Sequence, residues 1–136
     1  MAHKIFVNLP TKDLKRSRAF WESMGYSFNP QFSDDTAACL VFSEDIYAML
    51  LTHPKFKEFI DKPIVDTDAQ AAAIICLSAD SKDEVHRLVD AAVKAGGKEH
   101  RPMMDYGFMI QRSFADLDGH NWEVVFMDPS HVQPQS

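Results

Sequence analysis

Apolar residues in the first half of the chain follow a strand pattern, then a helical one, then short strand patterns again. Residues 5–9 are β-prone, and Pro10 closes this run. The next apolar residues recur at helical spacing until Gly25: Leu14, Phe20, Trp21 and Met24. Polar stretches then separate three β-prone runs, at residues 26–32, 37–42 and 46–52. This order predicts a strand, a helix and three antiparallel strands.

The second half of the chain repeats this order. Residues 74–78 form a β-prone run, and Ser81 with Glu84 has the spacing of a helix-capping box. Apolar residues at helical spacing follow, and Gly96 and Gly97 end the predicted helix: Val85, Leu88, Val89 and Ala92. Residues 108–114 and 122–127 are further predicted strands, joined by a turn at residues 116–119. The two halves are therefore offset by about 70 residues.

This duplication predicts an α+β fold of two tandem βαβββ modules, at about residues 3–60 and 71–128. Each sheet would leave one face bare, so we expect the two mixed sheets to curl around a cavity with the helices outside. We expect residues 1–128 to form a single domain and residues 129–136 to be a disordered tail. A ferredoxin-like fold has too few strands for this chain.

The connection over residues 52–70 carries more apolar residues than a plain loop needs: Pro54, Phe56, Phe59, Ile60, Pro63 and Ile64. Three interpretations stay open. This segment covers the cavity, packs on a second subunit, or forms a short amphipathic helix that closes the core of its own domain.

Both ends of the chain resemble the vicinal oxygen chelate superfamily, the glyoxalase/bleomycin resistance protein/extradiol dioxygenase family. At the start, the resemblance rests on residues 7–17, on the Phe20-Trp21 pair and on the Gly25-Tyr26 pair. At the end, it rests on residues 112–123, where an Asp-Gly turn leads into a strand that carries a glutamate. The resemblance covers about residues 3–128, but the fold by itself leaves the function open.

In the family's metalloenzymes, the ligands come from the first and fourth strands of each module. The resemblance places the corresponding positions at Phe6, Leu50, Ile74 and Glu123. A single carboxylate falls short of the three or four protein ligands that such metals use, so we expect no metal and no other cofactor. Three histidines lie nearby, each offset by an odd number of residues that turns a strand side chain to the other face: His3, His53 and His120.

Strand alternation predicts which side chains line the inner face and bind the ligand: Phe6, Asn8, Leu50, Ile74, Cys76, Asn121 and Glu123. This set is mostly apolar with a few polar groups, as in sites for small organic molecules. The apolar members are also compatible with an ordinary filled core. The facing of the strand over residues 108–114 is left open.

Glu123 is the candidate catalytic residue, because a carboxylate on an apolar face needs a partner, solvent or a proton. It acts as a general base or as the counter-ion of a cationic ligand group, or it is a structural residue bonded to Asn8 or Asn121. Cys39 and Cys76 lie in apolar runs, which indicates reduced, buried thiols rather than a disulfide. Two interpretations of His100, Arg101 and Arg112 stay open: they bind an acidic group of a substrate, or they are solvated surface residues, as isolated basic residues near turns more often are.

The composition disfavours two classes of partner. A formal charge of −6 and an isoelectric point near 5.4 disfavour nucleic acid and membrane surfaces, and no apolar run approaches membrane-spanning length. We expect a cytoplasmic protein that binds a small organic ligand without a metal. We also expect a homodimer, because modules of the family that the chain resembles commonly pair across an exposed sheet edge or complete a cavity with a neighbour. The alternative is a glyoxalase I-like lyase or isomerase that uses Glu123 as its general base.

Overall fold

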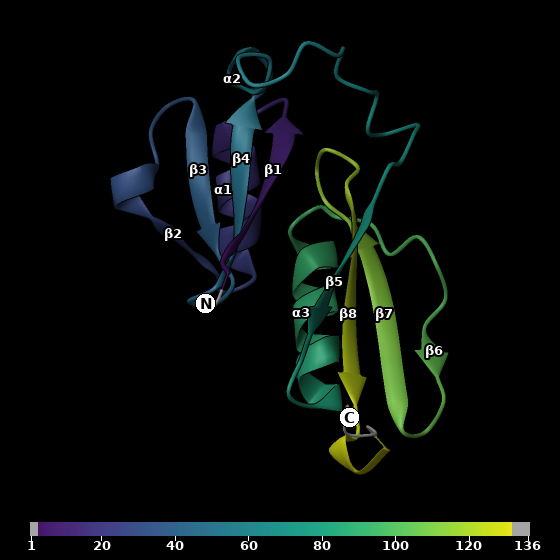
Figure 1. The fold of residues 1–136 in the computed structure, drawn as a ribbon. Helices are drawn as coiled ribbons and strands as arrows, with labels where there is room; N and C mark the ends of the chain where they lie inside the picture. Colours follow the sequence, from purple (N-terminus) through teal and green to yellow (C-terminus); the bar gives the residue numbers. More distant parts are fainter. Residues whose placement is uncertain (1–2, 132–136) are drawn as a thin grey trace. The chain divides into compact units, whose positions relative to one another are not determined.

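The computed structural model describes residues 3–131, and the chain divides into two units, Met1–Gln70 and Ala71–Ser136 (Figure 1). Each unit has one four-stranded mixed sheet with a helix packed against it. The α+β fold of two βαβββ modules, predicted from the repeat, is therefore confirmed.

The first unit has its strands in the order β1-β4-β3-β2, where β1 and β4 are parallel and the other pairs are antiparallel. Its elements are β1 (Ile5–Thr11), α1 (Leu14–Ser23), β2 (Ser27–Asn29), η1 (Pro30–Phe32), β3 (Ala37–Val41), β4 (Ile46–Thr52) and α2 (His53–Phe56). Asp13 starts α1 by accepting a hydrogen bond from the Arg16 amide at 3.1 Å. Gly25 follows the helix with a φ of 99°, which favours glycine.

The core of the first unit lies between α1 and one face of the sheet. The buried side chains of α1 include Leu14, Phe20 and Trp21. The parallel register pairs Val7 with Ala48 and Leu9 with Leu50, so these four side chains share a face. Ala48 and Leu50 are buried in this core.

The register corrects the predicted position of Leu50. Phe6 pairs with Tyr47 and Asn8 pairs with Met49, so Phe6 and Asn8 lie on the face opposite to Leu50. The rings of Phe6 and Tyr47 stack at 4.8 Å, as expected for neighbours on one face. Leu50 is therefore buried in the core of its own unit and does not share the face of Phe6 and Asn8.

The second unit has its strands in the order β5-β8-β7-β6, with only β5 and β8 parallel. Its elements are β5 (Ile74–Ser78), α3 (Lys82–Lys94), β6 (Met104–Asp105), β7 (Met109–Ala115), β8 (Asn121–Met127) and η2 (Pro129–His131). Ser81 caps α3 by accepting from the Glu84 amide at 3.1 Å, while the carboxylate of Glu84 binds Arg87. Only the Ser81 half of the predicted capping box forms.

The turn between β7 and β8 is organised by Asp116, which is 9% exposed. Its carboxylate accepts hydrogen bonds from the indole N–H of Trp122 at 2.9 Å and from the amides of Asp118 and His120, both at 3.0 Å. Burial raises the pKa of Asp116 despite these bonds. The predicted turn is therefore confirmed, and the structure adds that Asp116 also binds the buried Trp122.

Three local predictions differ from the structure. The strand predicted over residues 26–32 ends at Asn29, because Pro30 has no amide to donate and begins a 3-10 turn. The segment after β4 forms only the four-residue α2, and Phe59 is 71% exposed, so this part of the segment does not close the core. Pro129–His131 is a short 3-10 helix, and residues 132–136 of the predicted tail lie outside the described residues.

Candidate functional site

The candidate site is the face of the second sheet that is turned away from α3, which we call the open face. On the other face, Phe114, Trp122 and Val124 are fully buried on the side of α3. Because strand side chains alternate, their sequence neighbours point to the open face. The register aligns these neighbours in rows across the sheet: Ile74, Asn121 and Ala115; Cys76, Glu123 and Ser113; Ser78, Val125, Gln111 and Met104; and Met127 with Met109.

This register confirms that four of the predicted site residues share one face: Ile74, Cys76, Asn121 and Glu123. It also brings two residues to that face that the sequence analysis missed, Gln111 and Ser113. A signal for them was present. Once Phe114 of β7 is assigned to the core, period-2 alternation turns Ser113 and Gln111 to the opposite face.

The polar side chains of Gln111, Ser113, Asn121 and Glu123 on the open face have no hydrogen-bond partner in the described part of the chain. No hydrogen bond or ion pair joins the side chains of Gln111, Asn121 or Glu123 to any other residue in the described range 3–131. Ser113 is only 5% exposed, and its hydroxyl is the one buried side-chain polar atom in this range that lacks a hydrogen bond. Buried polar groups are nearly always bonded, so this hydroxyl needs an explanation. One explanation is a ligand that supplies the missing hydrogen bonds.

Glu123 occupies the middle of the row that contains this hydroxyl. It lies on β8 with Ser113 of β7 on one side and Cys76 of β5 on the other. Its side chain is partly buried, and no hydrogen bond joins it to Asn121 within the described unit. The interpretation of Glu123 as a structural clamp on Asn121 is therefore not supported, and its carboxylate is available to a ligand.

Cys76 differs from the prediction of a buried thiol, because it is exposed on the edge strand β5, whereas Cys39 is buried as expected. Desolvation by neighbouring side chains and the negative charge of Glu123 both raise the pKa of Cys76. The thiol is therefore protonated at neutral pH and is a weak nucleophile and a weak metal ligand.

Phe6 and Asn8 belong to the first unit. Phe6 is 50% exposed and stacks on Tyr47, while the Asn8 amide group donates to the Phe6 carbonyl at 3.3 Å. Both residues lie on the face turned away from the core, as the alternation predicted. A contact between Asn8 and Glu123 would join the two units, so it stays a prediction.

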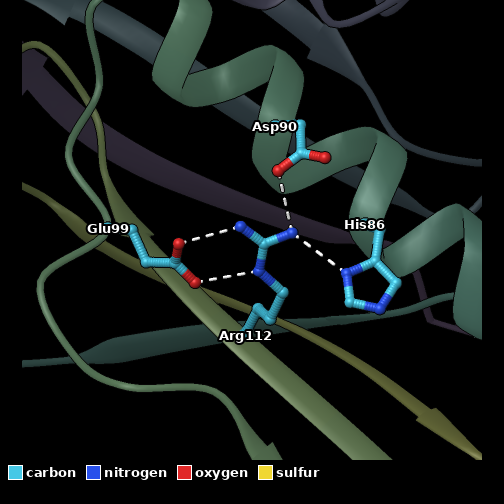
Figure 2. A network of polar contacts seen from close by, with 4 residues as sticks. All are labelled: His86, Asp90, Glu99 and Arg112. Atoms are coloured by element: carbon cyan, nitrogen blue, oxygen red, sulfur yellow. Dashed lines mark hydrogen bonds and ion pairs between the residues drawn. The ribbon is translucent and has the colours of Figure 1, made fainter.

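Arg112 lies on the helix side of the second sheet and makes a dense polar network (Figure 2). Its guanidinium donates two hydrogen bonds of 2.8 Å to Glu99, one of 2.9 Å to Asp90 and one of 3.1 Å to Nδ1 of His86. The side chain of Arg112 is 11% exposed, so the prediction of a solvated surface residue is wrong. A wide cleft of about 590 Å³ lies beside this network, lined also by His100 and Arg101. The carboxylates neutralise Arg112, so it does not offer a free charge to an acidic ligand.

The donors of the two sheets do not fit the metal site of the family's metalloenzymes. The open face of the second sheet offers one carboxylate, Glu123, and the protonated thiol of Cys76. None of His3, His53 and His120 lies within a strand, since β1 begins at Ile5, β4 ends at Thr52 and β8 begins at Asn121. Across residues 3–131, no group of three or more His, Cys, Asp or Glu side chains is placed to hold a metal ion.

Comparison with known proteins gives a consistent result for the fold. The family model described as Glyoxalase/Bleomycin resistance protein/Dioxygenase superfamily matches residues 5–124. A hypothetical protein from S. aureus has 23% sequence identity and a TM-score of 0.76, over 93% of this chain and 95% of that one. A glyoxalase/bleomycin resistance protein/dioxygenase family enzyme from Burkholderia phytofirmans PsJN has 16% sequence identity and a TM-score of 0.77. The match covers 93% of this chain and 99% of that one.

A bleomycin-binding protein, solved in complex with bleomycin, is also similar, with 18% identity and a TM-score of 0.63 over 92% of this chain and 98% of that one. Identities this low show the fold alone. Comparison with curated protein sequences gave no significant match. In the described part of the chain, no helix is both long enough and apolar enough to cross a membrane.

Proposed function

Because the chain belongs to the Glyoxalase/Bleomycin resistance protein/Dioxygenase superfamily, we propose that it binds a small organic molecule on the open face of its second sheet, without a metal ion. The observation that carries this proposal is the set of unpartnered polar groups on that face. Glu123, Gln111 and the buried Ser113 hydroxyl have no bonds within the described protein, while apolar side chains surround them. A few polar groups on an apolar surface are typical of sites for small organic ligands.

The relatives support this proposal at the level of the fold. One similar structure is a bleomycin-binding protein in complex with bleomycin, and another is a fosfomycin resistance protein from Mesorhizobium loti. Neither structure identifies the ligand of this chain, because their sequence identities to it are only 18% and 15%. Sequestration of a small molecule needs only a fitting surface and no catalytic group.

A fragment screen by two-dimensional NMR tests the proposal. We expect bound fragments to shift the backbone amides of β5, β7 and β8, in protein purified without added metal. The affinity is expected to be the same with EDTA and with added Zn²⁺, Ni²⁺ or Mn²⁺. Glu123→Gln is expected to change the affinity of polar fragments, whereas Glu22→Gln, the same change on the exposed surface of α1, is expected to have no effect.

Two outcomes contradict the proposal. If no fragment shifts the amides of these strands, the open face is not a binding site. If elemental analysis finds about one metal ion per chain, and removing it abolishes binding, the metal-free proposal is wrong.

A glyoxalase I-like lyase or isomerase remains a second candidate, since the unpartnered carboxylate of Glu123 is available as a general base. Such an enzyme would exchange the carbon-bound proton next to a carbonyl group with solvent. We would detect this exchange by NMR, with α-hydroxy carbonyl compounds in D₂O. Exchange that is lost in Glu123→Gln and kept in Glu22→Gln would establish this function, and its absence from the wild type would eliminate it.

We also propose that the protein is a cytoplasmic homodimer. The strands β1 and β5 are edge strands, and Ile5 and Ile74 on them are 56% and 63% exposed. Exposed apolar edge strands favour pairing with another chain. Light scattering is expected to give twice the chain mass of 15.4 kDa, and a monomer at working concentration would contradict the dimer.

A further inference from the structure

We propose that the row formed by Cys76, Glu123 and Ser113 anchors a protonated amine of the ligand, and that the ligand is therefore an apolar organic cation. This inference rests on the proposed function, because it names the chemical class that the open face binds.

The charge distribution of the open face is the first argument. Among the side chains that the register places on this face, Glu123 is the one charged group. It lies on β8, an inner strand of the sheet, and has no ion pair within the described residues. A partly buried carboxylate favours a nearby cation, because fewer water molecules solvate it. The formal charge of −6 on the chain also attracts cations rather than anions.

The Ser113 hydroxyl is the second argument, and it is independent of charge. Ser113 and Glu123 are directly paired between antiparallel strands, which places their Cβ atoms about 4.5–5.5 Å apart. The hydroxyl is buried and unbonded, so it keeps a free acceptor next to the carboxylate. An ammonium group carries three N–H donors and so binds both oxygens at once.

Cys76 and the surrounding side chains decide between an amine and a metal ion. The raised pKa keeps the Cys76 thiol neutral, so the row carries a single negative charge, which matches a monovalent cation. Divalent metal ions require more charged ligands than this row provides. Ile74, Val125 and Met109 in the neighbouring rows supply apolar contacts for the body of the ligand.

Three probes of similar size separate charge from shape: 2-phenylethylamine, which is protonated at pH 7, 2-phenylethanol and phenylacetate. Their affinities are measured from amide shifts of β5, β7 and β8 in the full chain. We expect the amine to bind about tenfold more tightly than the alcohol, and phenylacetate to bind more weakly than either. Glu123→Gln is expected to reduce the affinity for the amine to that for the alcohol, whereas Glu123→Asp keeps part of the preference.

Two further variants complete the test. Ser113→Ala is expected to weaken amine binding several-fold, because one acceptor is lost while the charge stays. Glu22→Gln is expected to leave all three affinities unchanged, and circular dichroism confirms that each variant is folded.

Equal affinities for the amine and the alcohol would overturn this inference and leave the proposed function intact. The inference would also fail if the preference for the amine survived in Glu123→Gln, or if none of the probes shifted these amides. The proposed function would fail only if the wider fragment screen also found no ligand on the open face.

Discussion

Replacing Arg112 with methionine tests what holds α3 and the segment after it against β7. Methionine keeps most of the apolar stem and removes the guanidinium. The change eliminates the two hydrogen bonds to Glu99 and the bond to Asp90, which connect three separate parts of the second unit (Figure 2). We expect a large loss of stability for a single polar residue.

The size of the stability loss expected for Arg112→Met follows from the solvent exposure of Arg112, Glu99 and Asp90. The side chains of Arg112 and Glu99 are 11% and 28% exposed, so their paired bonds are mostly shielded from water. Hydrogen bonds between charged groups contribute about 1.5–3 kcal/mol each, and the cost of desolvating the charges offsets part of this. Asp90 is 68% exposed and adds at most about 0.5 kcal/mol. We expect a net loss of about 2–3 kcal/mol, or a fall in Tm of roughly 6–12 °C.

Urea denaturation of Arg112→Met, Glu99→Gln and the double variant measures the coupling between the two residues. Arg87→Met is the matched control, because Arg87 pairs with Glu84 on α3 and is 55% exposed. We expect this control to lose less than about 0.5 kcal/mol.

The pH dependence provides a second check. The hydrogen bonds from Arg112 hold the pKa of Glu99 below its usual value of 4.5. The pair therefore makes its full contribution to the stability of the folded state above pH 4.5. This contribution is lost as the pH falls through the lowered pKa of Glu99. The difference between the wild type and Arg112→Met should therefore shrink in acid. A coupling energy below about 0.5 kcal/mol, or a difference that stays constant from neutral to acidic pH, would refute the reasoning.

Three further predictions follow from single residues. Asp116→Ala removes the carboxylate that accepts three hydrogen bonds, two buried and one partly buried, and we expect a loss of about 3 kcal/mol in thermal or urea denaturation; a loss under about 1 kcal/mol would contradict its role in the turn. Leu50→Ala empties a core position that is 3% exposed, so we expect a loss of about 2–5 kcal/mol, and a near-neutral effect would place Leu50 outside the core. The raised pKa of Cys76 should make its alkylation by iodoacetamide at pH 8 slower than that of a free thiol, and Glu123→Gln should accelerate it; an unchanged rate would argue against their proximity.

Several features of this protein were determined by the sequence alone, because they depend on local periodicity. Apart from the two-residue β6, for which the sequence indicated no strand, the order of the strands and the two long helices followed from the spacing of apolar residues and from stop signals such as Gly25. The assignment of Cys76 and Glu123 to one face was confirmed, since side chains alternate strictly along a strand. The turn at Asp116 followed from its own residues in the same way.

The tertiary structure decided what depends on contacts between distant segments. Leu50 was placed on the wrong face because the register of β1 against β4 is fixed by packing on α1, and no local pattern records it. The network of Arg112 with Asp90 and Glu99 joins residues up to 22 positions apart, so a basic residue in a strand gave no sign of it. The row through Glu123 and Ser113 likewise required the pairing of β7 with β8. Alternation places a side chain on a face, but only the alignment of neighbouring strands places two side chains next to each other.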